Sequence, residues 1–171
     1  AAAARTAQLI AKSKPDWVLL IGMAGTYDDG KLAIGDAACF DEVAIDGIGA
    51  GSGCDRLSAE QVGFAHWPGG EGTDAAPIHD HIKLHRPRSL APGGQLLTVC
   101  ATSATPQEAE ERRKRFPTVV AEDMEGFGVA IACRLASIPF TIIRGISNRV
   151  GERDVRTWKM DEPLAAACSL A

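Results

Sequence analysis

Two short polar motifs in the last third of the chain each follow a run of apolar residues. Met124-Glu125 comes after residues 118–121 and two further acids, and Ser147-Asn148 ends the run 139–146. A carboxylate accepts hydrogen bonds from neighbouring hydroxyl groups and stabilises a developing positive charge, whereas an amide both donates and accepts. Together these groups could hold a ligand that carries hydroxyls and a polar ring.

The segment between the two motifs predicts how they come together. Residues 118–121 and 139–148 are typical of buried strands and residues 126–136 of a helix, which together predict a βαβ unit. Ligands of parallel sheets bind beyond the carboxyl ends of the strands. We therefore expect Glu125 and Asn148 to share a pocket, because a buried carboxylate without partners is costly.

At these residues the sequence resembles the purine nucleoside phosphorylase and nucleosidase superfamily. Met124-Glu125 matches its Met-Glu pair, whose glutamate grips the ribose hydroxyls, and residues 144–148 match the strand end whose last residue meets the purine. Residues 146–154, with Trp158-Lys159, look most like the futalosine hydrolases of that superfamily. The resemblance implies one α/β domain over residues 1–171, a three-layer α/β/α fold with a central mixed, mostly parallel sheet.

The resemblance also implies an activity: hydrolysis of the N-glycosidic bond of futalosine to dehypoxanthine futalosine and hypoxanthine, in menaquinone biosynthesis, with no metal or cofactor. Glu125 and Asn148 are then the catalytic candidates. The Asn148 amide suits a 6-oxopurine, whereas adenine-cleaving relatives carry aspartate there. Arg144 is expected to orient its neighbours. The substrate-binding candidates are Met124, Met23, Ala24, Gly25, Thr102 and Ser103.

Two further strands are expected to bring the remaining candidates to the same edge. Residues 16–21 predict a buried strand followed by a tight glycine turn over 22–26, where the backbone can approach a ligand closely; a plain turn is the alternative. Residues 95–101 predict another strand that ends at Thr102 and Ser103. Phosphorylases of the resembled superfamily tend to carry serine where Met23 stands, which favours hydrolysis over phosphorolysis.

The rest of the chain gives weaker signals. Residues 37–43 predict a strand, and the glycine-rich residues 46–53 a flexible loop and not a dinucleotide site. Residues 54–94 are irregular. Their His79, His81 and His85 could bind a metal, contact the substrate's tail or a neighbouring subunit, or face solvent, and we favour the last. Thr105 and Glu108 form a capping box for a helix over 106–116, whose charges predict a solvated face.

Composition excludes several classes of protein. The 171 residues carry a net charge of −4 with interspersed signs and no long apolar run, so we expect no nucleic-acid partner, no membrane span and a cytoplasmic location. The five cysteines include no Cys-x-x-Cys pair, which argues against a zinc knuckle. The resemblance implies a homo-oligomer.

One departure from the resembled superfamily leaves alternatives open. Its water-activating glutamate lies near the N-terminus, before the region where this sequence starts, and residues 1–14 predict a helix in which Ala1 already lies. The family's first strands are therefore expected to be missing. A methylthioadenosine/S-adenosylhomocysteine nucleosidase, an aminodeoxyfutalosine nucleosidase and a noncatalytic nucleoside-binding subunit are the other hypotheses.

Overall fold

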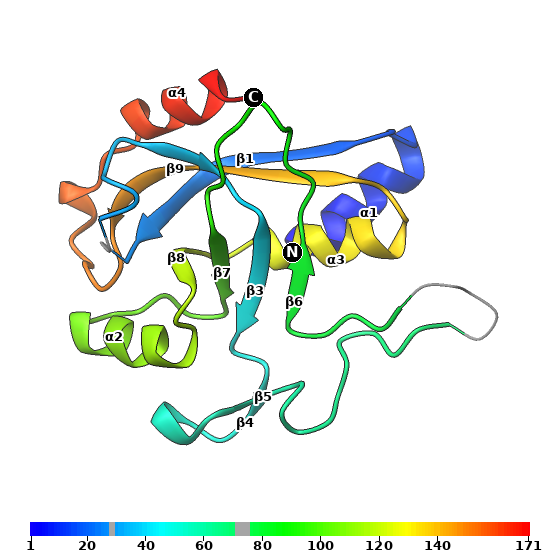
Figure 1. The fold of residues 1–171 in the computed structure, drawn as a ribbon, viewed down its shortest axis with the longest axis horizontal. Helices are drawn as coiled ribbons and strands as arrows, with labels where there is room; N and C mark the ends of the chain where they lie inside the picture. The colour runs from blue at the N-terminus through cyan, green and yellow to red at the C-terminus, as the bar shows by residue number, and fades with distance from the viewer. Residues whose placement is uncertain (28–29, 71–75) are drawn as a thin grey trace.

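A seven-stranded mixed sheet forms the centre of the protein (Figure 1). The computed structural model describes residues 1–27, 30–70 and 76–171. The strand order is β2-β9-β1-β8-β7-β3-β6, and the pairs β1/β9, β3/β7 and β7/β8 are parallel. The strands are β1 Val18–Thr26, β2 Ala37–Cys39, β3 Glu42–Asp46, β6 His81–Lys83, β7 Gln95–Val99, β8 Val119–Asp123 and β9 Phe140–Arg149.

Helices cover both faces of this sheet. Helices α1 (Ala2–Ser13) and α3 (Gly126–Leu135) pack together on one face, and α2 (Pro106–Arg115) and α4 (Asp161–Ser169) lie on the other. Successive strand residues alternate between the two faces, so Ile142 packs towards α3 and Ile143 towards α4. The predicted three-layer α/β/α architecture is confirmed.

The two halves of the sheet run in different directions and meet at the end of β1. In Figure 1, β1 and β9 run across the view, whereas β7, β3 and β6 run steeply. Strand β1 pairs with β9 along its whole length but reaches β8 only at Gly25 and Thr26, in antiparallel register. The chain does follow the predicted order β8-α3-β9, but β8 and β9 are not parallel neighbours, because β1 lies between them.

The predicted glycine turn over 22–26 is wrong. These residues are the last part of β1, where β9 supplies a pairing partner as far as Thr26. The strand predicted over 37–43 is also wrong as a single element. The chain leaves β9 after Cys39 and joins β7 from Glu42 onwards, so β2 and β3 are separate strands.

The two segments predicted to be loops contain more structure than expected. Asp46 is the buried end of β3, and β4 (Gly49–Ala50) pairs with β5 (Leu57–Ser58) beyond the short helix η1 (Gly53–Asp55). Residues 54–94 contribute Ile78 and Ile82 to the core, although residues 71–75 of that segment lie outside the described part. Among the described residues, no cluster of three or more potential metal ligands is found. None of the helices described is long and apolar enough to cross a membrane.

Helix α2 has the predicted start but not the predicted solvated face. The Thr105 hydroxyl accepts a hydrogen bond from the Glu108 N–H at 3.2 Å, as the capping box requires. Two of its basic residues, Arg112 and Arg115, turn inward and form ion pairs with the buried Asp46 at 2.8 and 3.0 Å. The interpretation of the whole charged run as a solvated face is therefore wrong for these two arginines.

Candidate active site

A cleft of about 380 Å³ lies where the ends of β1, β8 and β9 converge. It is also lined by the residues that follow β7 and by the segment between β9 and α4. All of the side chains and backbone segments predicted for the site lie on it: Met23, Ala24, Gly25, Thr102, Ser103, Met124, Glu125 and Asn148. The structure thus brings the candidates together, while their individual roles remain predictions.

A buried arginine holds the acidic end of β8. Arg144 of β9 donates from Nη2 to Asp123 Oδ2 at 2.5 Å and to Glu125 Oε2 at 3.2 Å, and from Nε to Asp123 Oδ2 at 3.0 Å. The side chains of Arg144 and Asp123 are 3% and 0% exposed, whereas that of Glu125 is 52% exposed. Asp123 is therefore the internal partner of the arginine, and Glu125 keeps an open side towards the cleft.

Glu125 is not used to cap helix α3. It occupies the N-cap position, but its side chain makes no capping hydrogen bond. Asp123 takes that role, since its Oδ2 accepts the Gly126 N–H at 3.0 Å. Because the Glu125 carboxylate lies at the helix N-terminus without making a capping hydrogen bond, it is available to a ligand.

Strand β1 has a glycine where Arg144 crosses it. A β-carbon built on Gly22 would lie 2.0 Å from Arg144 Nη1, which no real contact allows. Gly22 therefore allows a close approach between strand backbone and arginine, and it does not form a turn.

A β-bulge directs Ser147 and Asn148 into the same cleft. The register between β1 and β9 shifts so that Ala24 faces Ile146 and Gly25 faces Asn148, which leaves Ser147 as the extra residue. Consecutive residues of a regular strand point to opposite faces, whereas both of these line the cleft.

Local hydrogen bonds orient the Asn148 amide. Its Nδ2 donates to the Arg149 carbonyl at 2.8 Å, and its Oδ1 lies 2.8 Å from the Ser147 hydroxyl. An amide nitrogen carries two hydrogens and an amide oxygen two lone pairs, so each end retains one position for a ligand.

Ser103, which also lines the cleft, is tied to a buried carboxylate. Glu122 Oε1 accepts the Ser103 N–H at 2.9 Å, and Oε2 lies 3.1 Å from the Ser103 hydroxyl. Glu122 Oε2 also accepts from the Tyr27 hydroxyl at 2.7 Å and from Arg112 Nη1 at 3.0 Å. Both polar groups of Ser103 are thus engaged inside the protein.

These contacts change the acidity of two partners of Glu122. Burial, and then the charge of Glu122, raise the pKa of the Tyr27 hydroxyl far above its ordinary value, so Tyr27 stays a neutral donor. Burial alone would lower the pKa of Arg112, but the Glu122 and Asp46 carboxylates raise it overall. Arg112 therefore remains a cation.

Sequence reasoning missed several residues of this cleft. Glu122, Asp123, Arg153 and Trp158 all line it, as does Gly22 of the glycine segment that was expected to approach a ligand. Glu122 and Asp123 stand directly before Met124, so the acidic run was a visible signal for both, whereas no local signal marked Arg153. None of the described residues of 54–94 lines the cleft, so the structure does not place their histidines and arginines at this site.

The sequence and the fold both match known proteins. The profile described as "Phosphorylase superfamily" matches residues 1–169. Futalosine hydrolase from Acidothermus cellulolyticus is 36% identical over 148 residues, which cover 86% of this chain and 59% of that protein. Futalosine hydrolase from Streptomyces coelicolor is 31% identical over 154 residues, covering 88% and 61%. The chain thus spans about three fifths of the length of these curated relatives.

A solved structure gives the same fold. The 5'-methylthioadenosine/S-adenosylhomocysteine nucleosidase of Colwellia psychrerythraea, in complex with adenine, superposes with a TM-score of 0.76 at 24% identity, over 99% of this chain and 70% of that one.

Proposed function

This chain belongs to the phosphorylase superfamily, and we propose that it hydrolyses the N-glycosidic bond of futalosine to release hypoxanthine and dehypoxanthine futalosine. The observation that carries the proposal is the position of Glu125 and Asn148 on one cleft in a chain 36% identical to a futalosine hydrolase. Glu125 suits the sugar and Asn148 suits the purine.

Glu125 is suited to hold the ribose. Arg144 approaches it from the buried side at 3.2 Å, which fixes the carboxylate while its open side faces the cleft. A carboxylate in that place accepts hydrogen bonds from vicinal ribose hydroxyls and adds negative charge beside the oxocarbenium-like sugar that forms as the base leaves. The binding energy is then realised most fully in the transition state.

Asn148 is suited to hold a 6-oxopurine. Its amide is kept in place by Ser147 and the Arg149 carbonyl and still offers one donor and one acceptor position. An aspartate there would be able to protonate N7 beside an exocyclic amino group, as in the adenine-cleaving relatives of the superfamily. The amide therefore supports hypoxanthine as the leaving base.

Hydrolysis is favoured over phosphorolysis by Met23. This residue lines the cleft on β1 at the place where phosphorylases of the superfamily tend to carry a serine for phosphate. A thioether is a weak acceptor and no donor, so it offers little to a phosphate ion.

The resemblance to futalosine hydrolases also supports two wider predictions, a role in menaquinone biosynthesis and a homo-oligomeric state, and the composition supports a cytoplasmic location.

The proposal is tested by incubating the full-length protein with futalosine, methylthioadenosine and inosine separately, with and without phosphate, and measuring free base by chromatography. We expect hypoxanthine from futalosine at a rate that phosphate does not change. Adenine from methylthioadenosine, or a requirement for phosphate, would replace the proposal with a different reaction of the superfamily. Tight binding of futalosine without any product would indicate a noncatalytic nucleoside-binding subunit.

A further inference from the structure

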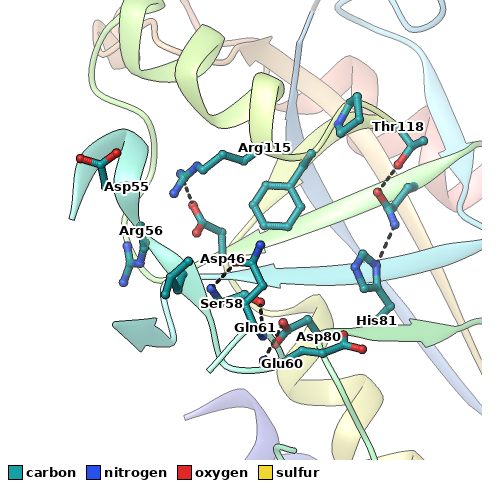
Figure 2. A pocket seen from close by; sticks show the side chains of 14 residues that line it. Asp46, Asp55, Arg56, Ser58, Glu60, Gln61, Asp80, His81, Arg115 and Thr118 are labelled. Atoms are coloured by element: carbon teal, nitrogen blue, oxygen red, sulfur yellow. Dashed lines mark hydrogen bonds and ion pairs between the residues drawn. The ribbon is translucent and has the colours of Figure 1, made fainter. Parts of the chain in front are cut away.

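A second cavity, of about 540 Å³, lies beside Asp46 and Arg115 (Figure 2). It is lined by the end of β3, by β5 and the residues on either side of it, by the starts of β6 and β7, and by the residues that join α2 to β8. Figure 2 shows Asp46 and Arg115 pointing towards one another at this cavity. The carboxyl group of Asp46 is the link between the two cavities, because its other partner is Arg112.

Arg112 spans the distance from this cavity to the candidate active site. Its Nε donates to Asp46 Oδ2 at 2.8 Å on one side. On the other side its Nη1 lies 2.5 Å from the Ser103 hydroxyl oxygen and 3.0 Å from Glu122 Oε2, and its Nη2 donates to the Ala101 carbonyl at 3.0 Å. One rigid guanidinium thus fixes the backbone before Ser103, the side chain of Ser103 and the carboxylate that receives the Ser103 N–H.

The charges of this group balance inside the protein. The carboxylates of Asp46 and Glu122 are 5% and 4% exposed, and the side chain of Arg112 is 14% exposed. Arg115 adds a second cation on the Asp46 side at 3.0 Å. Removing Arg112 would take away the cation that pairs with the buried Glu122 carboxylate next to Ser103.

We propose that Arg112 is a positioning residue of the active site, which holds the wall formed by residues 101–103 at the distance that the bound nucleoside requires. The proposal rests on the proposed function, because it assigns to Arg112 a share in nucleoside binding at that same cleft. Arg112 does not line the cleft and acts through Ser103 and Glu122, which do. Its effect is on the affinity for the nucleoside, since the wall meets substrate and transition state alike.

The test compares the steady-state kinetics of futalosine hydrolysis in full-length variants. Arg112→Met removes the charge and the donors, Arg112→Lys keeps a charge that can satisfy only some of the partners, and Asp46→Asn weakens the anchor from the second cavity. Lys114→Met is the matched control, because Lys114 lies exposed on the same helix and loses the same charge. Thermal unfolding of each variant shows that it is folded.

We expect Arg112→Met to raise KM by about tenfold or more while kcat changes by less than about threefold, because small displacements of a binding wall cost affinity. Arg112→Lys and Asp46→Asn should raise KM by smaller factors, and Lys114→Met should leave it unchanged. A purely structural role would lower the melting temperature and the active fraction with KM unchanged, and that result in Arg112→Lys and Asp46→Asn would overturn the proposal even if Arg112→Met does not fold.

The wild type separates this proposal from the proposed function. If the wild type releases no hypoxanthine from futalosine, the proposed function fails. The same variants are then compared on whichever nucleoside of the panel is cleaved. If none is cleaved, they are compared by the dissociation constant of the nucleoside that binds. Equal affinities in wild type and Arg112 variants would then reject the positioning role.

Discussion

The guanidinium of Arg144 lies across the backbone of Gly22, and it is this crossing that lets a residue of β9 reach Glu125 beyond β8. A β-carbon at position 22 would stand 2.0 Å from Nη1. The carboxylate proposed to grip the sugar is therefore positioned from a strand two places away in the sheet, over a glycine that leaves room for it.

Gly22→Ala should push Arg144 aside and lower catalysis. We expect kcat/KM for futalosine to fall by about tenfold or more, because Glu125 loses its fixed orientation. Gly128→Ala is the control: it lies within helix α3, where the nearest atom to an added β-carbon is 3.4 Å away, and alanine favours a helix. Steady-state kinetics of the two variants test this prediction. Equal kcat/KM values would show that catalysis does not need Arg144 to cross the backbone at Gly22.

Arg144→Met should strongly destabilise the fold. It leaves Asp123 charged and 0% exposed without its cationic partner, and breaking such a buried pair costs about 3–5 kcal/mol. We expect the lower end of that range, because Thr98 and the Gly126 N–H still donate to Asp123. Urea denaturation measures the loss in the free energy of unfolding.

The double variant Asp123→Asn/Arg144→Met, compared with the two single variants, measures how much the ion pair itself contributes to stability. Once both charges are gone, no unpaired charge remains buried, so the double variant should be more stable than Arg144→Met alone. If the double variant is less stable by the sum of both single losses, the two residues act independently and the ion pair is not what holds this site.

Asn148→Asp should change which base is released. The carboxylate cannot donate to the 6-oxo group unless protonated, so hypoxanthine release from futalosine should fall by about tenfold or more. Release of adenine from methylthioadenosine, measured by chromatography, should rise relative to it. An unchanged ratio of the two rates would mean that Asn148 does not select the base.

The stability contributed by Tyr27 should disappear at high pH. Burial, and then Glu122, raise the pKa of its hydroxyl in the folded protein, so the folded state holds this proton more tightly than the unfolded chain does. That contribution is complete below the unfolded pKa of about 10 and is lost as the pH rises above it. The free energy of unfolding should therefore fall more steeply above about pH 10 in the wild type than in Tyr27→Phe. Parallel profiles would contradict the shift.

Local patterns predicted the elements around Glu125 and Asn148 well. The apolar runs before each motif are strands β8 and β9, and the helix between them is α3, within a few residues of the expected ends. The convergence on one cleft was predicted as well, but for an incomplete reason. A strand from elsewhere in the chain, β1, lies between the two, and its partners are set by packing that no local pattern reports.

Local sequence patterns could not predict contacts between residues that are far apart in the chain. Arg112 was interpreted as part of a solvated helix face, because its partner Asp46 stands 66 positions earlier in a segment that looked like a flexible loop. Gly22 was interpreted as part of a turn because glycine is common in turns, whereas its reason here is a side chain from another strand.

The most direct test of the proposed function is base release from futalosine by the full-length wild type and by Glu125→Gln in phosphate-free buffer. The amide keeps the shape and removes the charge of a side chain that is 52% exposed, and Arg144 keeps its buried partner Asp123, so the variant should fold. We expect the wild type to release hypoxanthine and the variant to be slower by about 10²–10³-fold in kcat. Equal rates in the two proteins, or no hypoxanthine from the wild type, would contradict the account.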